Sequence, residues 1–232
     1  MIATVMLDRG IPLRYLDDML YMNAPFISHA KIMWGLGWML PVLPERLRVY
    51  RTHKVPVFCG GTLYEYHRRR GEFTTYLDWL KDAGFEWLEI SDGTIDLPHA
   101  DKLADIREAG MRGFHVIGEV GRKAAVESYT RSEWMDRICD ELDAGVKYVT
   151  CEGRESGDAG IYGEDGQLNT ALIESLRQLT GQLIFEATAK RHQVSLMARL
   201  GRDVNLGNIL PDDVLGLAAL RAGLRPETLE MP

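Results

Sequence analysis

The chain has 232 residues, of which 46% are hydrophobic and 26% charged, and its formal net charge is -7 at pH 7. This length and apolar content suffice for one ordinary α/β barrel or two small domains with a sizeable core, and they exclude a disordered chain. The acidic balance argues against a nucleic-acid partner or an anionic membrane surface, because both favour an excess of Lys and Arg.

Short β-branched or apolar runs alternate with segments of helical period along the whole chain, a pattern typical of β/α units and a parallel sheet. The expected strands, in chain order, are Ile2–Leu7, Ile27–Met33, Val55–Cys59, Phe85–Ile90, Phe114–Gly118, Lys147–Cys151, Leu183–Glu186 and Asp203–Gly207. The helices expected after them are Pro12–Met22, Pro41–Thr52, Glu72–Ala83, Pro98–Ala109, Arg131–Ala144, Leu168–Thr180, Lys190–Leu200 and Pro211–Arg221. Prolines near the helix starts and glycines just past the helix ends support these boundaries.

The fold class follows from the number of these pairs. No linker, low-complexity tract or charge block marks a boundary, so we expect a single domain over residues 1–232. Eight β/α pairs in this length favour an α/β fold of the (β/α)8 TIM-barrel type over a doubly wound sheet. Active sites of such barrels lie at the C-terminal ends of the strands, so the residues that follow each strand are the functional candidates.

Acidic side chains are unusually frequent at these positions. A single carboxylate after a strand is more often a helix cap or a solvated loop group, so the prediction rests on the grouping. Carboxylates gathered at one mouth repel each other unless cations neutralise them, and a partly hydrated Mg2+ shared with an anionic substrate is the natural cation. The candidate metal ligands are Asp8, Glu89, Asp92, Glu119, Glu152 and Glu186.

Other residues at the expected mouth favour binding of a small anionic phosphorylated substrate. The turn at Gly207 and Asn208 precedes Pro211, and loops after strands seven and eight of these barrels often bind phosphate on backbone N–H groups. The pair Gly60 and Gly61 is a weaker signal, since it is more often a tight turn. The candidate substrate- and phosphate-binding residues are Arg9, Gly61, Lys190, Asn205, Gly207 and Asn208.

The cysteines and the apolar runs point to an intracellular setting. Cys59, Cys139 and Cys151 have no CxxC spacing, so neither a disulfide framework nor a thiolate zinc site is expected. The N-terminus has no basic leader, and the longest apolar stretch, residues 32–44, is too short and too interrupted to span a bilayer. We therefore expect a cytoplasmic protein with no membrane association.

Five ungapped segments resemble the phosphosulfolactate synthase family, and they occur in order through nearly the whole chain. They are Gly-Gly-Thr-Leu-Tyr-Glu at 60–65, Glu-Ile-Ser-Asp-Gly at 89–93, Glu-Gly-Arg-Glu-Ser-Gly at 152–157, Val-Asn-Leu-Gly-Asn-Ile at 204–209 and Leu-Arg-Ala-Gly-Leu-Arg at 220–225. The resemblance implies a homo-oligomeric barrel lyase that uses Mg2+ to add sulfite to phosphoenolpyruvate, giving 2-phospho-3-sulfolactate for coenzyme M biosynthesis. Relatives also include bacterial proteins of unclear role and plant heat-stress-associated proteins not known for that reaction.

The implied reaction needs groups that stabilise negative charge and a proton donor. Attack on C3 of phosphoenolpyruvate moves charge onto the carboxylate, which Mg2+ and nearby cations must stabilise before C2 is protonated. The family's proposed donor lies in a Glu-Val-Gly-Lys-Lys segment that here reads Glu-Val-Gly-Arg-Lys at 119–123, so the resemblance assigns this role to Lys123. Lys31 and Arg154 complete the catalytic candidates as cations for phosphate, carboxylate or the incoming anion.

Departures from the family pattern leave the second substrate open. Residues 8–10 read Asp-Arg-Gly instead of Asp-Lys-Gly, and residues 31–35 read Lys-Ile-Met-Trp-Gly instead of Lys-x-Gly-Trp-Gly. Residues 186–193 read Glu-Ala-Thr-Ala-Lys-Arg-His-Gln instead of Glu-Ala-Pro-Gln-Lys-Ser-Gln-Gln. One alternative is therefore a different nucleophile or a different phosphorylated substrate. A second is a non-catalytic, stress-related barrel. A third is a phosphate-handling isomerase or aldolase with Lys31 or Lys123 as a Schiff-base lysine.

Overall fold

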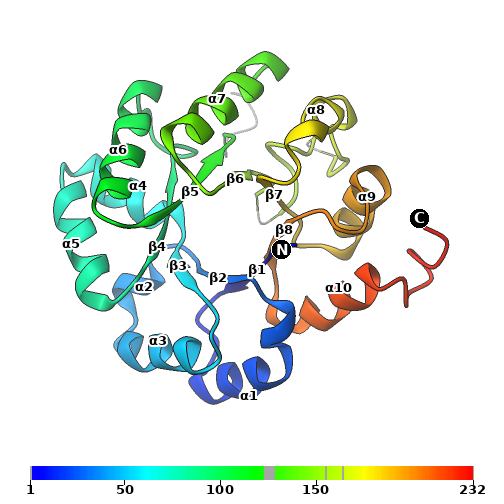
Figure 1. Cartoon of the computed structure of the whole chain (residues 1–232), viewed down its shortest axis with the longest axis horizontal. Helices are drawn as coiled ribbons and strands as arrows, with labels where there is room; N and C mark the ends of the chain where they lie inside the picture. The colour runs from blue at the N-terminus through cyan, green and yellow to red at the C-terminus, as the bar shows by residue number, and fades with distance from the viewer. Residues whose placement is uncertain (1, 123–128, 155, 164, 232) are drawn as a thin grey trace.

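The computed structural model describes residues 2–122, 129–154, 156–163 and 165–231. Eight parallel strands form a nearly closed ring, and the helices that alternate with them lie outside it (Figure 1). The predicted (β/α)8 barrel is confirmed. The strands are β1 (Thr4–Asp8), β2 (His29–Ile32), β3 (Val57–Cys59), β4 (Trp87–Ser91), β5 (His115–Val120), β6 (Tyr148–Cys151), β7 (Leu183–Glu186) and β8 (Leu206–Ile209).

The outer layer consists of α-helices with shorter 3-10 turns. The α-helices are α1 (Leu13–Asn23), α2 (Leu36–Met39), α3 (Leu43–Thr52), α4 (Gly61–Arg69), α5 (Phe73–Ala83), α6 (His99–Met111), α7 (Arg131–Ala144), α8 (Thr170–Ser175), α9 (Lys190–Leu200) and α10 (Val214–Arg221). The 3-10 turns are η1 (Ala24–Phe26), η3 (Arg177–Leu179) and η4 (Pro211–Asp213). None of the described helices is both long enough and apolar enough to cross a membrane.

Local sequence explains the helix ends that were predicted most closely. Helix α7 begins with a capping box, in which the Thr130 hydroxyl accepts from the backbone of Glu133 and the Glu133 side chain accepts from the backbone of Thr130. It ends at Gly145, whose left-handed φ of 106° a residue with a side chain rarely adopts. These two signals fix the helix within the sequence itself, so its predicted bounds agree with the structure.

Several elements differ from the sequence prediction, among them the short helix α2, which was not predicted, and α8, which is shorter than predicted; two differences bear on the site. Helix α4 was not predicted, because its Gly-Gly start is typical of a turn and its buried residues include polar ones such as Glu65. The eighth strand was predicted over Asp203–Gly207 but runs over Leu206–Ile209. Val204, Leu206 and Ile209 are all buried, so hydrophobicity alone does not locate the start of this strand.

The barrel interior is layered because strand residues two apart point to the same side. Val5, Phe58, Ile117 and Ile184 form an apolar layer across the barrel. One pleat further along their strands, Ile117 is followed by Glu119 and Ile184 by Glu186 on the same face. The apolar layer therefore supports a layer of charged side chains that lies closer to the C-terminal ends of the strands.

The barrel closes between β3 and β4. These strands end the hydrogen-bonded order β3-β2-β1-β8-β7-β6-β5-β4, and they lie in contact. Two bonds cross this seam: the Gly61 amide donates to Glu89 Oε2 at 2.8 Å, and the Ser91 hydroxyl donates to Glu65 Oε1 at 2.6 Å. Because these side chains are buried, the seam joins the start of α4 to β4 and to the charged layer.

Candidate active site

A pocket of about 600 Å3 opens at the C-terminal ends of the strands. Its walls come from segments that are far apart in the chain, as the barrel topology requires. Seven of the residues predicted to be functional line it: Lys31, Gly61, Glu119, Glu152, Arg154, Glu186 and Asn208. The remaining lining residues are Leu7, Met33, Trp34, Gly60, Thr62 and Ser156.

Lys31 lies at the base of this pocket, surrounded by carboxylates. Its Nζ is 2.8 Å from Glu89 Oε2, 3.2 Å from Glu119 Oε2 and 3.3 Å from Glu186 Oε1. Burial alone would lower the pKa of the Lys31 ammonium, but the attraction of the three carboxylates outweighs it and raises that pKa well above its usual value. Lys31 is therefore a permanently charged ammonium at neutral pH.

Three carboxylates contact the single ammonium of Lys31. Burial, and to a smaller extent repulsion by Glu119, raises the pKa of Glu89 to about 7 against the opposing attraction of Lys31. Glu89 thus exchanges a proton near neutral pH. Carboxylates this close to one another repel unless cations or a proton neutralise them.

Three pocket residues have left-handed backbone although they are not glycines. The φ angles are 53° at Trp34, 57° at Arg154 and 57° at Asn208, and Lys54 is the fourth such residue in the described part of the chain. This conformation is costly for side-chain-bearing residues, above all for a bulky one such as Trp34, and it concentrates at functional sites. Trp34 and Arg154 follow the ends of β2 and β6, whereas Asn208 lies near the end of β8, and all three line the pocket.

Asn208 offers an amide to a ligand in this pocket. Its residue surface is only 6% exposed, and it lines the pocket. Arg154 also lines the pocket, with a side chain that is 51% exposed and lies 3.7 Å from Asp158. A side-chain amide at the pocket wall offers two N–H donors and one acceptor oxygen to a ligand.

Two of the predicted metal ligands point away from the pocket. Asp8 accepts from Arg46 Nη1 at 2.6 Å and from the Tyr50 hydroxyl at 2.6 Å, which binds β1 to α3. Asp92 accepts from Lys102 at 2.8 Å. The alternation of strand residues explains both cases: Leu7 and Ser91 face inward, so the residue after each of them faces the helices.

Glu89 neither lines the pocket nor points outward to the helices. It is fully buried below the pocket, where it contacts Lys31 but does not line the open space. Gly61 lines the pocket, and an added Cβ there would be 2.2 Å from the Ser91 hydroxyl oxygen. This glycine is therefore required by the close approach of α4 to β4 at the seam, and its amide is already bonded to Glu89.

Asn205 and Gly207 do not lie at the mouth as predicted. The Asn205 side chain accepts from the Ala3 amide at 2.7 Å and donates to the Leu183 carbonyl at 3.0 Å, at the N-terminal end of the barrel. Gly207 lies within β8, where an added Cβ would be 2.9 Å from Ile184 Cγ2. Asn205 and Gly207 lie away from the predicted mouth because β8 begins later in the chain than predicted. Of these two residues and Asn208, only Asn208 lines the pocket.

Of the remaining cations predicted for this site, the two that the structure describes are not gathered in it. Lys190 begins α9 and pairs with Glu227 at 2.5 Å on the exposed surface. Arg9 is exposed and does not line the pocket. Lys123 lies outside the described residues. Conversely, the hydroxyl residues Thr62 and Ser156 line the pocket but were not predicted, although both fall in segments that carried the family resemblance.

The described residues contain no group of three or more His, Cys, Asp or Glu arranged to hold a metal ion by themselves. Mg2+ does not require such a cage, because it usually keeps several waters and takes one or two carboxylates together with substrate oxygens. Glu119, Glu152 and Glu186 all line the pocket and provide the hard oxygen donors that Mg2+ prefers. The donor set thus fits a shared, partly hydrated ion.

Comparisons with known proteins agree with this architecture. The solved structure of a 3-hexulose-6-phosphate synthase matches with a TM-score of 0.59 and 11% identity, covering 94% of this chain and 98% of that one. The carboxyl transferase domain of Rhizobium etli pyruvate carboxylase, with pyruvate and biocytin, matches with a TM-score of 0.63 and 12% identity over 98% of this chain and 44% of that one. At these identities the likeness concerns the fold alone.

The sequence comparisons are more specific. The family model described as (2R)-phospho-3-sulfolactate synthase (ComA) matches residues 2–227. The chain is 35% identical over 232 residues to the phosphosulfolactate synthase of Methanocaldococcus jannaschii, covering 97% of this chain and 92% of that protein. It is 32% identical over 233 residues to the phosphosulfolactate synthase of Bacillus subtilis, covering 97% and 91%. The predicted resemblance is confirmed, and the chain belongs to the phosphosulfolactate synthase family of enzymes.

Proposed function

We propose that this protein is a lyase that adds sulfite to C3 of phosphoenolpyruvate, forming 2-phospho-3-sulfolactate. The observation that carries the proposal is the charged Lys31 ammonium at the base of a polar pocket whose rim holds Arg154 and Asn208. Phosphoenolpyruvate has a phosphate and a carboxylate, and two cations with an amide donor match such a small dianionic or trianionic molecule. Membership of the family supports the same reaction class.

The reaction requires no redox step and no leaving group. The sulfur lone pair of sulfite forms the new bond to C3, and the electron pair of the C2–C3 double bond moves onto C2 and the carboxylate. C2 then takes up one proton. Lys31 lies where it stabilises the charge that builds up on the carboxylate, and burial strengthens this attraction because little water screens it.

Arg154 and Asn208 are assigned to the phosphate. Arg154 donates from a flat guanidinium that matches two phosphate oxygens at once, and the Asn208 amide, which also lines the pocket, adds a further donor. Holding both ends of the substrate fixes C3 toward the open side, where sulfite enters. Lys123 remains the predicted proton donor for C2 by family resemblance.

Mg2+ would be held by one or two of Glu119, Glu152 and Glu186 in this proposal. When bound, it supplies charge neutralisation on the carboxylate and phosphate oxygens of the substrate. Lys31 draws Glu119 and Glu186 to the base of the pocket and screens the repulsion between them.

The direct test is a proton NMR assay. Purified protein is incubated with phosphoenolpyruvate, sulfite and Mg2+, and the vinyl proton signals are followed with time. We expect these signals to disappear only when all three are present, and to persist after removal of Mg2+ with a chelator. Persistence in the complete mixture would contradict the synthase assignment.

The same assay distinguishes the alternative in which another nucleophile replaces sulfite, since vinyl proton loss would then occur with a thiol or an amine instead. A non-catalytic barrel is disfavoured by the intact Lys31 cluster, whose buried charge is costly to maintain without use. A role in coenzyme M biosynthesis, a cytoplasmic location and a homo-oligomeric state remain predictions from the family resemblance.

A further inference from the structure

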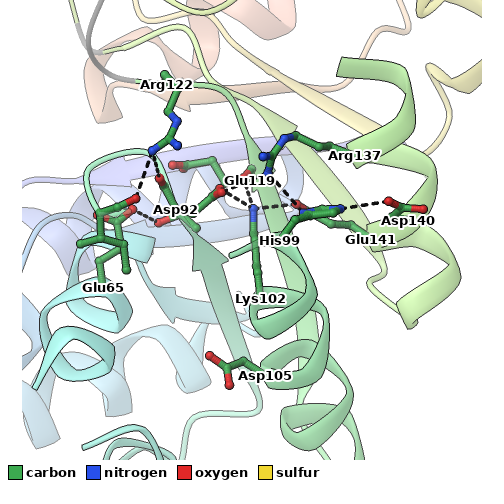
Figure 2. A network of polar contacts seen from close by, with 12 residues as sticks. Glu65, Asp92, His99, Lys102, Asp105, Glu119, Arg122, Arg137, Asp140 and Glu141 are labelled. Atoms are coloured by element: carbon green, nitrogen blue, oxygen red, sulfur yellow. Dashed lines mark hydrogen bonds and ion pairs between the residues drawn. The ribbon is translucent and has the colours of Figure 1, made fainter. Parts of the chain in front are cut away.

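A second buried polar network lies beside the pocket, between the barrel and helices α6 and α7 (Figure 2). Its centre is Lys102, which has no exposed surface. The Lys102 ammonium is 2.8 Å from Asp92 Oδ1 and 2.6 Å from Glu141 Oε1, and it donates to the main-chain carbonyl of Glu119 at 2.7 Å. A fully buried lysine is rare and costly unless every proton finds a partner.

Asp92 connects this lysine to two arginines. Its Oδ2 accepts from Arg137 Nη1 at 3.2 Å, and its main-chain carbonyl accepts from Arg122 Nη1 at 3.2 Å. The three cations come from α6, α7 and the segment that follows β5. Asp92 therefore joins the end of β4 to the end of β5 and to both covering helices.

An outer tier extends the network toward the surface. The Arg137 guanidinium lies 4.3 Å from the centre of the Tyr129 ring, and the Arg122 guanidinium lies 5.7 Å from the same ring. Arg137 also contacts His99 Nδ1 at 3.2 Å, and His99 Nε2 lies 3.1 Å from an Asp140 oxygen. The two guanidiniums that reach Asp92 are thus held by the same aromatic ring.

The network approaches the main chain of β5 at two consecutive residues. At Gly118 an added Cβ would be 2.0 Å from Glu141 Oε2, so the carboxylate packs directly on the strand. At Glu119 the carbonyl accepts from Lys102, while the side chain of the same residue reaches Lys31 at 3.2 Å. Glu119 is therefore fixed from outside the barrel through its backbone and acts inside it through its carboxylate.

We propose that Asp92 and Lys102 are positioning residues for the active site, which hold the main chain at Glu119 so that its carboxylate meets Lys31 at the base of the pocket. The proposal rests on the proposed function, because it gives Lys31 and Glu119 their part in the reaction. It removes Asp92 from the metal ligands and gives it a role behind the pocket wall. Neither positioning residue touches the substrate.

The test uses graded variants of the full chain. Asp92→Asn keeps the size of the side chain and removes its charge. Arg137→Met removes an outer contact from a side chain that is already 21% exposed, so it threatens the fold least. Arg112→Met is the matched control, because Arg112 lies just past α6 and pairs with Asp78 at 2.7 Å and Glu108 at 3.3 Å away from the pocket. Arg137→Lys tests rescue by a conservative change.

The first measurement does not depend on turnover. In protein labelled with 15N-lysine, the slowly exchanging ammonium signal of Lys31 is assigned by its loss in Lys31→Met. We expect Asp92→Asn and Arg137→Met to shift this signal and to speed its hydrogen exchange, although neither residue contacts Lys31. In Arg137→Lys the Lys31 signal should return part of the way to its wild-type position. In Arg112→Met it should stay at the wild-type position.

The second measurement is turnover of phosphoenolpyruvate and sulfite. We expect kcat to fall by about tenfold to a hundredfold in Asp92→Asn, the usual effect of losing a group that orients a site residue, while KM changes little. An unchanged Lys31 signal in folded Asp92→Asn and Arg137→Met would overturn the proposal. If the wild-type protein shows no turnover, the proposed function fails, and the Lys31 signal still decides whether this network positions Glu119.

Discussion

The ammonium of Lys31 lies 2.8 Å from a carboxylate oxygen of Glu89 inside the barrel, with little solvent around either group. The two residues are on strands β2 and β4, separated by β3 and by the seam where the barrel closes. Burying such a pair costs free energy that packing of apolar residues would not, so the pair is better explained by its place under the pocket than by stability.

Lys31→Met should destabilise the protein by about 3–5 kcal/mol, because it leaves buried carboxylates without their cation. Urea unfolding followed by circular dichroism measures the change. The matched double variant Lys31→Met with Glu89→Gln should regain part of the lost stability, since one of the three repelling charges is gone. Strictly additive losses in the double variant would mean that the two groups are not coupled.

Borohydride treatment should not label Lys31. The three carboxylates keep its ammonium protonated at neutral pH, and only the neutral amine attacks a carbonyl. The protein is incubated with pyruvate and borohydride, digested, and the peptide that contains Lys31 is weighed by mass spectrometry. An adduct on this peptide would support the aldolase alternative and contradict the charge state derived from the structure.

Asn208→Gly should weaken substrate binding without weakening the fold. A φ of 57° is no strain for glycine, so the free energy of unfolding should stay within about 1 kcal/mol of wild type. Loss of the amide should raise KM for phosphoenolpyruvate about tenfold, as expected for one hydrogen bond to a charged group. Lys54→Gly is the control, because Lys54 has the same φ on the exposed surface. An equal KM in both variants would remove Asn208 from the binding site.

His29 should make the protein less stable in acid. Burial, with a smaller effect from the charge of His115, lowers the pKa of His29 to about 4. Because the folded-state pKa lies below the unfolded value, this contribution to stability is complete above about pH 6.5 and is lost as the pH falls toward about 4. The loss amounts to about 3 kcal/mol for such a shift.

The measurement compares wild type with His29→Phe, which keeps a ring in contact with Trp87. Urea unfolding is measured across this pH range, and the difference between the two proteins is plotted against pH. Other groups titrate in both proteins and cancel in the difference, notably Glu89, whose raised pKa gives the opposite trend. A flat difference would show that His29 does not titrate abnormally in the folded state.

Local signals in the sequence were enough to predict the barrel and some of the residues that line the pocket. The alternation of apolar runs with helical segments identified all eight strands at least in part, and the capping signals around α7 set its bounds. Charged residues were correctly expected at the strand ends, since Lys31, Glu119, Glu152 and Glu186 do line one pocket. These features follow from short-range periodicity, which the chain carries whatever its neighbours are.

Whether each charged residue at a strand end faces the pocket or the outer helices could be decided only from the tertiary structure. Asp92 follows Glu89 by three residues, and the odd spacing turns it outward to Lys102, which lies on a helix and has no signal in the sequence that would link it to β5. Asn205 was predicted at the mouth but lies at the opposite end of the barrel, because β8 begins later than its hydrophobic pattern suggests.

The sequence by itself therefore determined the barrel, the family and the acidic character of the mouth, because these depend on residue type and on the period of two along a strand. Only the tertiary structure decided that Lys31 is held by Glu89, Glu119 and Glu186 and that Asp8 and Asp92 serve the outer wall. The physical reason is that burial and charge pairing depend on distances between strands and helices, and those distances exist only once the ring has closed.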